Sequence, residues 1–532
     1  MKKQAWRVLF FATPVHRDQG AHMARIRLAG GIALLAVTAS ACGLGNDDRP
    51  SGAGDGGGHL VYAEHLPPVA AWALESNDAF TLTRAGCLEP LVQSELDGSL
   101  SEKLATSWEQ VEPTAWEFQL REDVQFQDGT PMDADAVVGA LTHVLEAKTP
   151  ARSFNAEVIS GVEAVDESTI RIETKQPDVL LAYRMASPNT GILAPKAYEG
   201  EQIDIEGTCT GPFEVVEENS QQSLTLERNE TYWGGTPALA TAEIRFIVDG
   251  EVRATQLQAG EVDIAPYLPV AHLTQLEGND DLAVTTTEQP RTTAMMLNNS
   301  RPPFDDPLVR QAIQRAIDTQ AIADSIYEGV MSPAIGPFAP DQPWAPQDVS
   351  PVSPDLDEAR RLLDEAGVDP SALSFQLMAY VSRPEFPDVA AVIQDQLGQL
   401  GIEVKIRSGD AATFEPEWLA GDYDAALLSR GYLLDVGDPA GYLAADYTCA
   451  GSYNVAHYCD EETDTQVNQA LQNENQGARY ETYRSLAQKL QSEAVNVFLV
   501  HESGVVGATT SVENFEQHPL NFYVFTKDLD VS

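Results

Sequence analysis

The sequence predicts an α/β protein with two lobes. The chain has 532 residues, enough for two or more lobes that each bury a full core. Residues 373–406 show strand, helix and strand patterns in that order, which predicts a parallel pair of strands with the helix as crossover. Residues 116–145 show a strand pattern followed by a turn and a helix pattern. Together these stretches favour an α/β fold.

The clearest single element is the strand at residues 116–121, where apolar and polar side chains alternate. Asp128 and Gly129 follow as a turn signal. Asp133 stands where a helix N-cap belongs, and residues 137–145 carry apolar side chains at helical spacing. We therefore expect a strand, a turn and a capped helix in this order.

The same reasoning places the other elements along the chain. Asp306 is expected to cap a helix that has Pro307 at its first position, and Gly329 to end the short helix that follows. Arg310 and Asp318 are expected to be structural polar groups. The further expected elements are a strand at 59–63, a strand and turn at 224–232, a helix at 355–366, a strand at 373–379, a helix at 389–400, strands at 402–406 and 424–429, and a helix and then a strand within 486–500.

The charge and the residue types exclude several functions. The formal net charge is −48, so nucleic acid is not an expected partner, because phosphate binding needs a basic face. The excess acid is interpreted as a solvated acidic surface or as an adaptation to a salty medium. The chain has no C-x-x-C, G-x-S-x-G or H-E-x-x-H motif. We therefore expect neither an enzyme nor a metal site, and no cofactor.

The amino end has the features of an export signal. Residues 28–37 form an apolar run that follows Arg25 and Arg27 and is too short to span a bilayer. Small residues at 39–41 precede Cys42, which resembles the lipobox of bacterial lipoproteins and implies lipidation of Cys42. We predict a signal peptide over residues 1–41, with Met23 as the alternative start, and a flexible, lipid-anchored tether over 42–56.

A family resemblance rests on three strings between residues 107 and 131. Ser107-Trp108-Glu109, residues 118–121 and residues 124–131 together resemble the signature of the family 5 extracellular solute-binding proteins. These are the peptide- and nickel-type receptors of ATP-driven importers. Further stretches similar to the family are 89–92, 207–213, 228–235, 256–265 and 298–329. Within them, Tyr232 and Trp233 are expected to be core packing residues.

The resemblance implies a two-lobed, periplasmic-binding-protein-like fold of type II, cluster C, with a hinge and a central cleft. Lobe I is predicted to comprise residues 57–287 and 500–532, and lobe II residues 288–499. The implied function is that of a monomeric lipoprotein at the outer face of the cytoplasmic membrane. It would capture a small peptide in the cleft and deliver it to the membrane permease of an ABC importer.

Two charged residues follow predicted strands and are candidate ligand contacts. Arg383 follows the strand at 373–380, and Asp435 follows the strand at 424–429. In open α/β sheets, ligands bind beyond the carboxyl ends of the strands. A zwitterionic peptide needs a cation for its carboxylate, which the planar guanidinium suits, and an anion for its amine. The alternative is an ordinary surface arginine and a turn aspartate.

The resemblance assigns these residues more closely. Ser382-Arg383-Pro384 is similar to the segment of dipeptide-binding proteins whose arginine holds the peptide carboxylate. Residues 432–439 are similar to their Trp-x-x-Asp-x-Gly-Asp-Pro segment, which makes Asp435 the residue that holds the amine. Tyr432 replaces the tryptophan, and Asp438 is expected to be a turn residue. Tyr432 and Tyr453 are added as candidate ligand-binding residues.

Cysteine pairing is the last expectation. Besides Cys42, the chain has Cys87, Cys209, Cys449 and Cys459. Similar family members carry a disulfide at the position of Cys449 and Cys459, which leaves Cys87 and Cys209 as the second pair.

Two alternative functions stay open. One is a nickel, metal-chelate or other small-solute receptor, for which His457 is the only histidine near the predicted ligand loops. The other is a secreted hydrolase.

Overall fold

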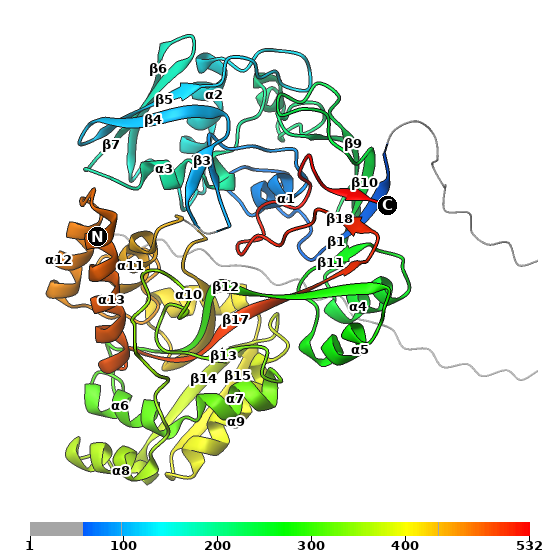
Figure 1. Cartoon of the computed structure of the whole chain (residues 1–532). Coiled ribbons are helices and arrows are strands. Elements are labelled where there is room, and N and C mark those ends of the chain that lie inside the picture. Colours follow the sequence, from blue (N-terminus) through cyan, green and yellow to red (C-terminus); the bar gives the residue numbers. More distant parts are fainter. Residues whose placement is uncertain (1–56, 97, 435) are drawn as a thin grey trace, which may run out of the picture. The chain divides into compact units, whose positions relative to one another are not determined.

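The structure, a computed structural model, describes residues 57–96, 98–434 and 436–532 (Figure 1). The predicted signal peptide and tether lie outside the described residues, and so do Met23, Cys42 and Asp435. Among the described residues, no helix is both long enough and apolar enough to cross a membrane.

Most strands of the described chain belong to one mixed sheet of eleven strands. Its order is β15, β14, β16, β12, β17, β11, β1, β10, β9 and β8, and β13 pairs with β17 outside this path. The strands are β1 (His59–Glu64), β8 (Phe213–Asn219), β9 (Ser223–Arg228), β10 (Thr241–Phe246), β11 (Ile264–Ala265), β12 (Leu282–Leu297), β13 (Ser332–Pro333), β14 (Ser374–Tyr380), β15 (Glu403–Gly409), β16 (Ala425–Gly431) and β17 (Asn496–Thr509).

Two long antiparallel strands, β12 and β17, join the halves of this sheet (Figure 1). The carboxyl half of β12 pairs with β16, where Arg291 lies opposite Gly431. The carboxyl half of β17 pairs with β11, where Gly507 lies opposite Ala265. Their own pairing shifts register between Glu288 and Thr292. This pair is therefore the shared support of the strands on both sides.

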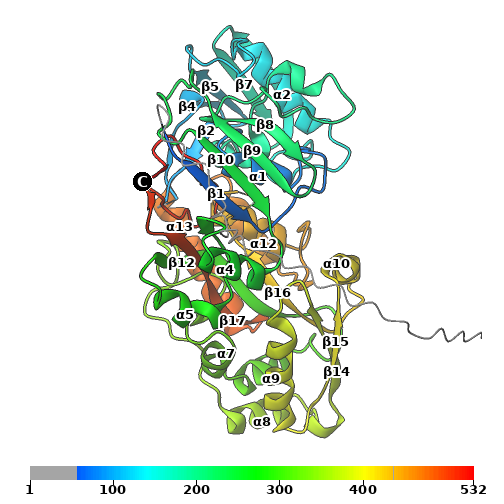
Figure 2. The same ribbon diagram turned by 90° about the vertical axis from the view of Figure 1, so that its right-hand side faces the viewer.

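The predicted strand-helix-strand unit is present (Figure 2). β14 and β15 run parallel, with Ser374 opposite Glu403, and α9 (Phe386–Gly398) connects them. Val389, Ile393 and Leu397 of α9 are buried at helical spacing. β16 also runs parallel to β14, so the carboxyl ends of β14 and β16 meet at one edge of the sheet.

A second, antiparallel sheet contains the strand that the alternation at 116–121 predicts. Its order is β4 (Ala105–Glu112), β5 (Ala115–Leu120), β7 (Thr169–Thr174) and β6 (Ile159–Asp166). The helix α2 (Ala134–Leu145) follows, and the Asp133 carboxylate accepts from the Ala136 N–H at 2.9 Å. Gly129 takes the left-handed turn conformation with a φ of +84°. Strand, turn and cap are thus confirmed.

The other predicted caps are also present. Asp306 accepts from the Leu308 N–H with Pro307 at the first position of α6 (Pro307–Ala316), and Asp318 caps α7 (Thr319–Ile326). Arg310 is buried and donates to the backbone oxygens of Phe304, Glu493 and Ala494, as expected for a structural group.

The remaining helices and strands cover the sheets or connect their strands. The helices are α1 (Asp78–Arg84), α3 (Leu181–Arg184), α4 (Gly250–Gln258), α5 (Leu273–Glu277), α6 (Pro307–Ala316), α7 (Thr319–Ile326), α8 (Leu356–Glu365), α10 (Ala411–Ala420), α11 (Pro439–Tyr447), α12 (Glu461–Ala470) and α13 (Gln476–Ser492). Two short pairs of strands complete the set, β2 (Val92–Ser94) with β3 (Leu100–Glu102) and β18 (Val512–Glu513) with β19 (Asp530–Val531).

The buried apolar side chains form two large clusters. One cluster draws its members from residues 294–500, with Leu180 as the exception. The other draws its members from residues 60–264 and 506–529. A smaller cluster packs around Leu257 and Val505. This division runs close to the predicted lobe boundaries, which stay a prediction.

Both predicted cysteine pairs are bonded in the structure. Cys87 and Cys209 form a disulfide across 122 positions of the chain, with their Cα atoms 5.2 Å apart. Cys449 and Cys459 form the other, across 10 positions, with Cα atoms 4.3 Å apart. The second disulfide closes the loop that contains Tyr453.

Candidate functional site

The predicted carboxylate-binding residue, Arg383, lies just beyond the carboxyl end of β14. Its side chain is 30% exposed. The guanidinium Nη1 lies 3.1 Å from a Glu502 oxygen on β17, and Nη2 donates to the Ser429 hydroxyl on β16 at 3.0 Å. Glu385 stands farther from Nη1, at 3.6 Å. The structure therefore places Arg383 at the expected sheet edge, held by groups from β16 and β17, between which β12 lies.

Glu502 is the buried anion of this cluster. It is 2% exposed, and its Oε1 accepts from the hydroxyls of Thr293 and Ser429. Burial alone would raise the pKa of Glu502, but the guanidiniums of Arg383 and Arg291 hold that pKa below its ordinary value. Burial lowers the pKa of the Arg383 guanidinium, but Glu502 and the other nearby acidic groups together raise it by more, so the pKa lies above its ordinary value. Both groups are therefore ionised.

The loop that follows β16, residues 432–438, contains the second predicted contact and is called the ligand loop below. Tyr432 is 1% exposed and packs against Phe338 and Tyr442, with ring centroids 5.2 and 6.3 Å away. Its hydroxyl accepts from the Ala339 N–H at 3.4 Å. The structure thus places Tyr432 within a core, and its role in lining a ligand stays a prediction. Asp435, the predicted partner of the amine, lies outside the described residues.

Asp438 does more than form a turn. Its carboxylate caps α11 through the Ala440 N–H, and it is buried. It also pairs with Arg479 of α13 at 3.1 Å and accepts from the Tyr483 hydroxyl at 2.5 Å. The end of the ligand loop is therefore held to α13 by an ion pair and a hydrogen bond, and to α11 by the cap.

The third predicted contact, Tyr453, lies half-buried between two arginines. The Arg430 guanidinium stands 4.9 Å from its ring centroid, and that of Arg152 stands 5.7 Å away. Arg152 belongs to the amino-terminal part of the chain and Arg430 to β16. Burial raises the pKa of Tyr453 above its ordinary value. Tyr453 thus contacts residues from both predicted lobes.

Other groups also bring the predicted lobes together. The Val179 N–H donates to the Leu471 carbonyl at 3.2 Å, and Gln476 donates to the Tyr183 hydroxyl at 3.4 Å. A narrow cavity of about 10 Å³ is lined by Tyr183 on one side and by Leu434 and Gly437 of the ligand loop on the other. Beside the ligand loop, the two predicted lobes are therefore in direct contact.

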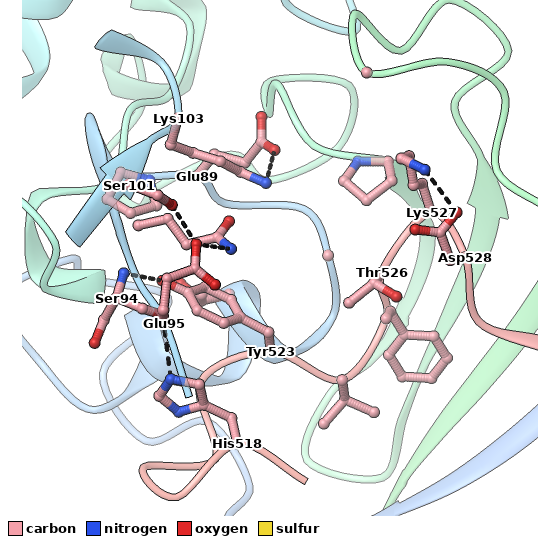
Figure 3. A pocket seen from close by; sticks show the side chains of 18 of the residues that line it. Glu89, Ser94, Glu95, Ser101, Lys103, His518, Tyr523, Thr526, Lys527 and Asp528 are labelled. Atoms are coloured by element: carbon pink, nitrogen blue, oxygen red, sulfur yellow. Dashed lines mark hydrogen bonds and ion pairs between the residues drawn. The ribbon is translucent and has the colours of Figure 1, made fainter. Parts of the chain in front are cut away.

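A larger hollow, of about 760 Å³, lies within the predicted lobe I (Figure 3). Glu89 and Lys103 lie on one side of it, and Lys527 and Asp528 lie across from them. These charges pair with one another, Lys103 with Glu89 at 3.0 Å and Lys527 with Asp528 at 2.6 Å. These ion pairs make the lining of the hollow polar, but their charges neutralise one another and do not favour a ligand of either sign.

The two aromatic residues expected to pack in the core have a polar role beside this hollow. Tyr232 is buried and donates to Glu89 at 2.8 Å, and half-buried Trp233 donates through Nε1 at 3.0 Å. The Arg121 guanidinium stands 4.4 Å from the Trp233 ring centroid. Packing alone does not account for these residues, because both of them satisfy a buried carboxylate.

Within the described part of the chain, no group of three or more His, Cys, Asp and Glu side chains is placed to hold a metal ion. His457, the histidine that the sequence places near the ligand loops, has its Nε2 2.8 Å from the Trp418 carbonyl oxygen. This contact makes His457 part of the local backbone network.

Comparison with known families decides the class of the protein. Residues 99–454 match the family described as bacterial extracellular solute-binding proteins, family 5, middle region. The match covers more than half of the chain. The protein is a family 5 extracellular solute-binding protein. This match confirms the resemblance seen in the sequence and the implied two-lobed α/β fold. Proteins of this family serve ABC importers and are extracytoplasmic, and so is this binding protein.

Relatives of this family 5 protein are named for different ligands. The chain is 24% identical over 447 residues to the nickel-binding protein NikA of Staphylococcus aureus, covering 83% of this chain and 88% of NikA. It is 27% identical over 472 residues to the glutathione-binding protein GsiB of Pectobacterium atrosepticum, covering 86% and 91%. Both names describe binding and not catalysis.

A solved structure shows the same fold. The periplasmic binding protein DppA of Helicobacter pylori, in complex with the peptide STSA, superposes with a TM-score of 0.75 and 22% identity. The superposition covers 89% of this chain and 98% of that one. It supports the solute-binding fold of this family 5 protein and does not by itself assign its ligand.

Sequence reasoning missed the charged partners of Arg383. Glu502 and Arg291 lie in β17 and β12, and neither stands in a motif or after a strand. Only the pairing of these two strands brings them to the edge where β14 and β16 end. A single charged residue within a long apolar strand, such as Glu502, is the signal that would have found the cluster.

Proposed function

We propose that this protein is the receptor of an ABC importer that captures a small peptide between its two lobes. Residues 57–287 with 500–532 would form one lobe, and 288–499 the other. The observation that carries the proposal is Arg383, an ionised and partly exposed guanidinium at the carboxyl edge of β14 and β16. A guanidinium binds a peptide carboxylate through two parallel hydrogen bonds.

The ligand loop supports the same proposal. Asp435 would receive the peptide amine, with Tyr432 and Tyr453 near the side chains. Its neighbour Leu434 lines the narrow cavity opposite Tyr183. The peptide would enter while the lobes are apart, and closure would follow as a population shift driven by contacts to both lobes. The closed receptor, a monomer, would then dock on the permease.

Calorimetric titration of the purified protein with a panel of di-, tri- and tetrapeptides tests the proposal. We expect Arg383→Ala and Asp435→Ala each to abolish peptide binding while the folded state persists, as judged by circular dichroism. Arg301→Ala is the matched control, because Arg301 is exposed and donates to a backbone oxygen. Wild-type affinity in either site variant would refute the site, and no peptide binding by the wild type would refute the ligand class.

A second candidate ligand is a nickel chelate. The observation in its favour is the similarity to the nickel-binding protein NikA. In this alternative the metal would arrive bound to a small organic chelator. Titration with Ni(II)–histidine distinguishes the two: binding of this complex, in a protein that binds no peptide, would replace the first proposal by the second.

We also propose that lipid on Cys42 anchors the receptor at the outer face of the cytoplasmic membrane. The support is the run of small residues before Cys42 and the exported character of the family. Expression of the full chain and of Cys42→Ser tests this by fractionation. The wild type should be recovered with membranes and the variant in the soluble exported fraction, whereas equal distribution would refute the anchor.

A further inference from the structure

Four neighbouring strands bring one charged or hydroxyl group each to a single edge of the large sheet. These groups are Arg291 on β12, Arg383 just after β14, Ser429 on β16 and Glu502 on β17. The pairing of Arg291 with Gly431, and of Thr292 with His501, sets this convergence. The edge is the one at which the parallel strands β14 and β16 end, where ligands of open α/β sheets bind.

The hydroxyl of Ser429 holds both guanidiniums. It accepts from Arg383 Nη2 at 3.0 Å and from Arg291 Nη1 at 3.1 Å, and it donates its own proton to Glu502. A hydroxyl has one donor and two acceptor positions, so all three are used. The two arginines are therefore fixed side by side through one oxygen atom.

The single buried carboxylate compensates the two arginines unequally. Glu502 lies 3.1 Å from Arg383, and Glu385 adds a second carboxylate near the same guanidinium at 3.6 Å. Arg291 has no ion pair within the described part of the chain, and its bonds go to Ser429 through Nη1 alone. Of the two guanidiniums, Arg291 is therefore the one whose positive charge is less neutralised by carboxylates of the protein.

The other edge of the Arg291 guanidinium makes no hydrogen bond to the described residues, and the Arg291 side chain is half-buried. Its Nε and Nη2 donate to no residue that the structure describes. Gly431 lies beside this edge, and a Cβ atom there would stand 3.3 Å from Nη2 and 3.5 Å from the Cβ of Leu434. Glycine thus avoids a side chain next to the guanidinium, and Leu434, which a Cβ at this position would contact, also lines the narrow cavity opposite Tyr183.

We propose that Arg291 is a second carboxylate-binding residue, which receives the ligand's carboxylate on its Nε and Nη2 edge next to Arg383. Two parallel N–H donors on a planar cation match the two oxygens of a carboxylate. The ligand class is a molecule with a free carboxylate, such as the free terminus of a peptide. The choice of a peptide rests on the proposed function, whereas the carboxylate site does not.

The test compares the wild type with Arg291→Gln and Arg291→Lys. Glutamine keeps a donor for Ser429 and removes the charge and the paired N–H edge, and lysine keeps the charge alone. Arg301→Gln is the matched control, and circular dichroism checks that each variant is folded. The first measurement is the Tm in acetate and in N-acetylalanine, against chloride at the same ionic strength. We expect these carboxylates to raise the Tm of the wild type and control, but not that of Arg291→Gln.

The second measurement is the Kd of Ala-Leu and of its C-terminal amide, by calorimetry. Loss of a charge-assisted pair should weaken binding of the acid by about 10-fold or more in Arg291→Gln and leave the amide within about 3-fold. Arg291→Lys should recover only part of the loss, because a point charge lacks the paired donors.

The outcomes separate the two proposals. Equal carboxylate stabilisation in Arg291→Gln and the wild type, or none in the wild type, overturns the Arg291 assignment. So does equal loss of affinity for the acid and the amide. Failure of Ala-Leu and the wider peptide panel to bind the wild type, together with carboxylate stabilisation that needs Arg291, refutes the peptide ligand and supports the carboxylate site.

Discussion

At the scale of single residues, Glu502 decides the chemistry of the candidate site. It is a carboxylate in the middle of β17 with 2% of its surface exposed, and it holds the guanidinium of Arg383 at 3.1 Å. A buried charge is tolerated only when it is paired and hydrogen-bonded. Without Glu502, two adjacent guanidiniums would face one another with no buried anion. Its role is therefore to make the arginine pair stable before any ligand arrives.

We predict that Glu502→Gln destabilises the folded protein by about 3 kcal/mol at pH 7, because it leaves Arg383 without its buried counter-ion. The pKa of Glu502 is lowered in the folded state, so the ionised form contributes stability above the unfolded pKa of about 4.3. That stability is lost as the pH falls through the folded pKa, and the difference between variant and wild type should shrink below about pH 4.

Urea unfolding at pH 7 and pH 3.5 measures both effects of Glu502→Gln. Glu403→Gln is the matched control, because Glu403 pairs with Lys405 on the surface and both side chains are exposed. The control should behave as the wild type. A stability of Glu502→Gln equal to that of the wild type at pH 7 would contradict the role of Glu502.

Arg383 was predictable from sequence and Arg291 was not, for a physical reason. Arg383 follows a strand directly, and the carboxyl end of a parallel strand is a local signal. Arg291 acquires its place only through the pairing of β12 with β16, between residues 140 positions apart. Tyr432 also follows a strand directly, but its packing against Phe338 depends on a residue more than 90 positions away and has no local signal in the sequence.

At the scale of elements, the paired strands β12 and β17 carry a buried histidine. His501 Nε2 accepts from the Ile335 N–H at 3.1 Å, so its proton lies on Nδ1 and is directed to the Thr292 hydroxyl at 2.9 Å. Thr292 in turn donates to the Pro337 carbonyl at 2.9 Å. Burial lowers the pKa of His501 to about 3. This network needs the neutral ring.

We predict that stability falls as the pH is lowered, in part because of His501. In the unfolded chain a histidine binds a proton below a pKa of about 6.5, whereas in the folded chain His501 stays neutral down to about 3. Its contribution is full above the unfolded pKa and is lost as the pH falls from there. Below pH 6, this one group should contribute a slope of about 1 kcal/mol per pH unit.

The measurement is the free energy of unfolding between pH 6.5 and pH 4.5 for the wild type and His501→Gln. The slope of the variant should be smaller by that amount, whatever its absolute stability. His59→Gln, at an exposed position, should leave the slope as in the wild type. Equal slopes in His501→Gln and the wild type would mean that this network does not resist protonation.

Elements with local signals were predictable, and those built by distant pairing were not. Asp133 and Asp306 cap their helices as expected, because a cap bonds to an N–H two or three positions away. The crossover β14–α9–β15 is likewise set by periodicity within one stretch. By contrast, β12 extends over Leu282–Leu297, and its first half, rich in threonine, shows no regular alternation. Its length is determined by its partner β17.

At the scale of the whole molecule, the dominant property is a formal net charge of −48. Many carboxylates are used locally, as helix caps or in ion pairs such as Asp438 with Arg479. Others, such as Glu261 and Glu277, are exposed, and repulsion among such exposed carboxylates favours the unfolded chain, in which charges stand farther apart. Salt weakens it, since the Debye length falls from about 30 Å at 0.01 M to about 3 Å at 1 M.

We predict that the Tm rises by several degrees as KCl increases from 0.01 M to 1 M. Potassium chloride is the suitable salt, because sulfate would also strengthen apolar burial and obscure the effect of screening. Sucrose at matched osmolality controls for exclusion of solutes, and it should not reproduce the steep rise at low concentration that screening gives. Buried attractive pairs, such as Asp438 with Arg479, are screened much less than the surface charges, and exposed pairs, such as Glu403 with Lys405, contribute little stability. The weakening of attractive pairs by salt therefore does not offset the stability gained from weaker repulsion.

A Tm that is unchanged or lower in KCl would show that surface repulsion is already compensated in the folded state. It would also remove a saline medium as the reason for this charge.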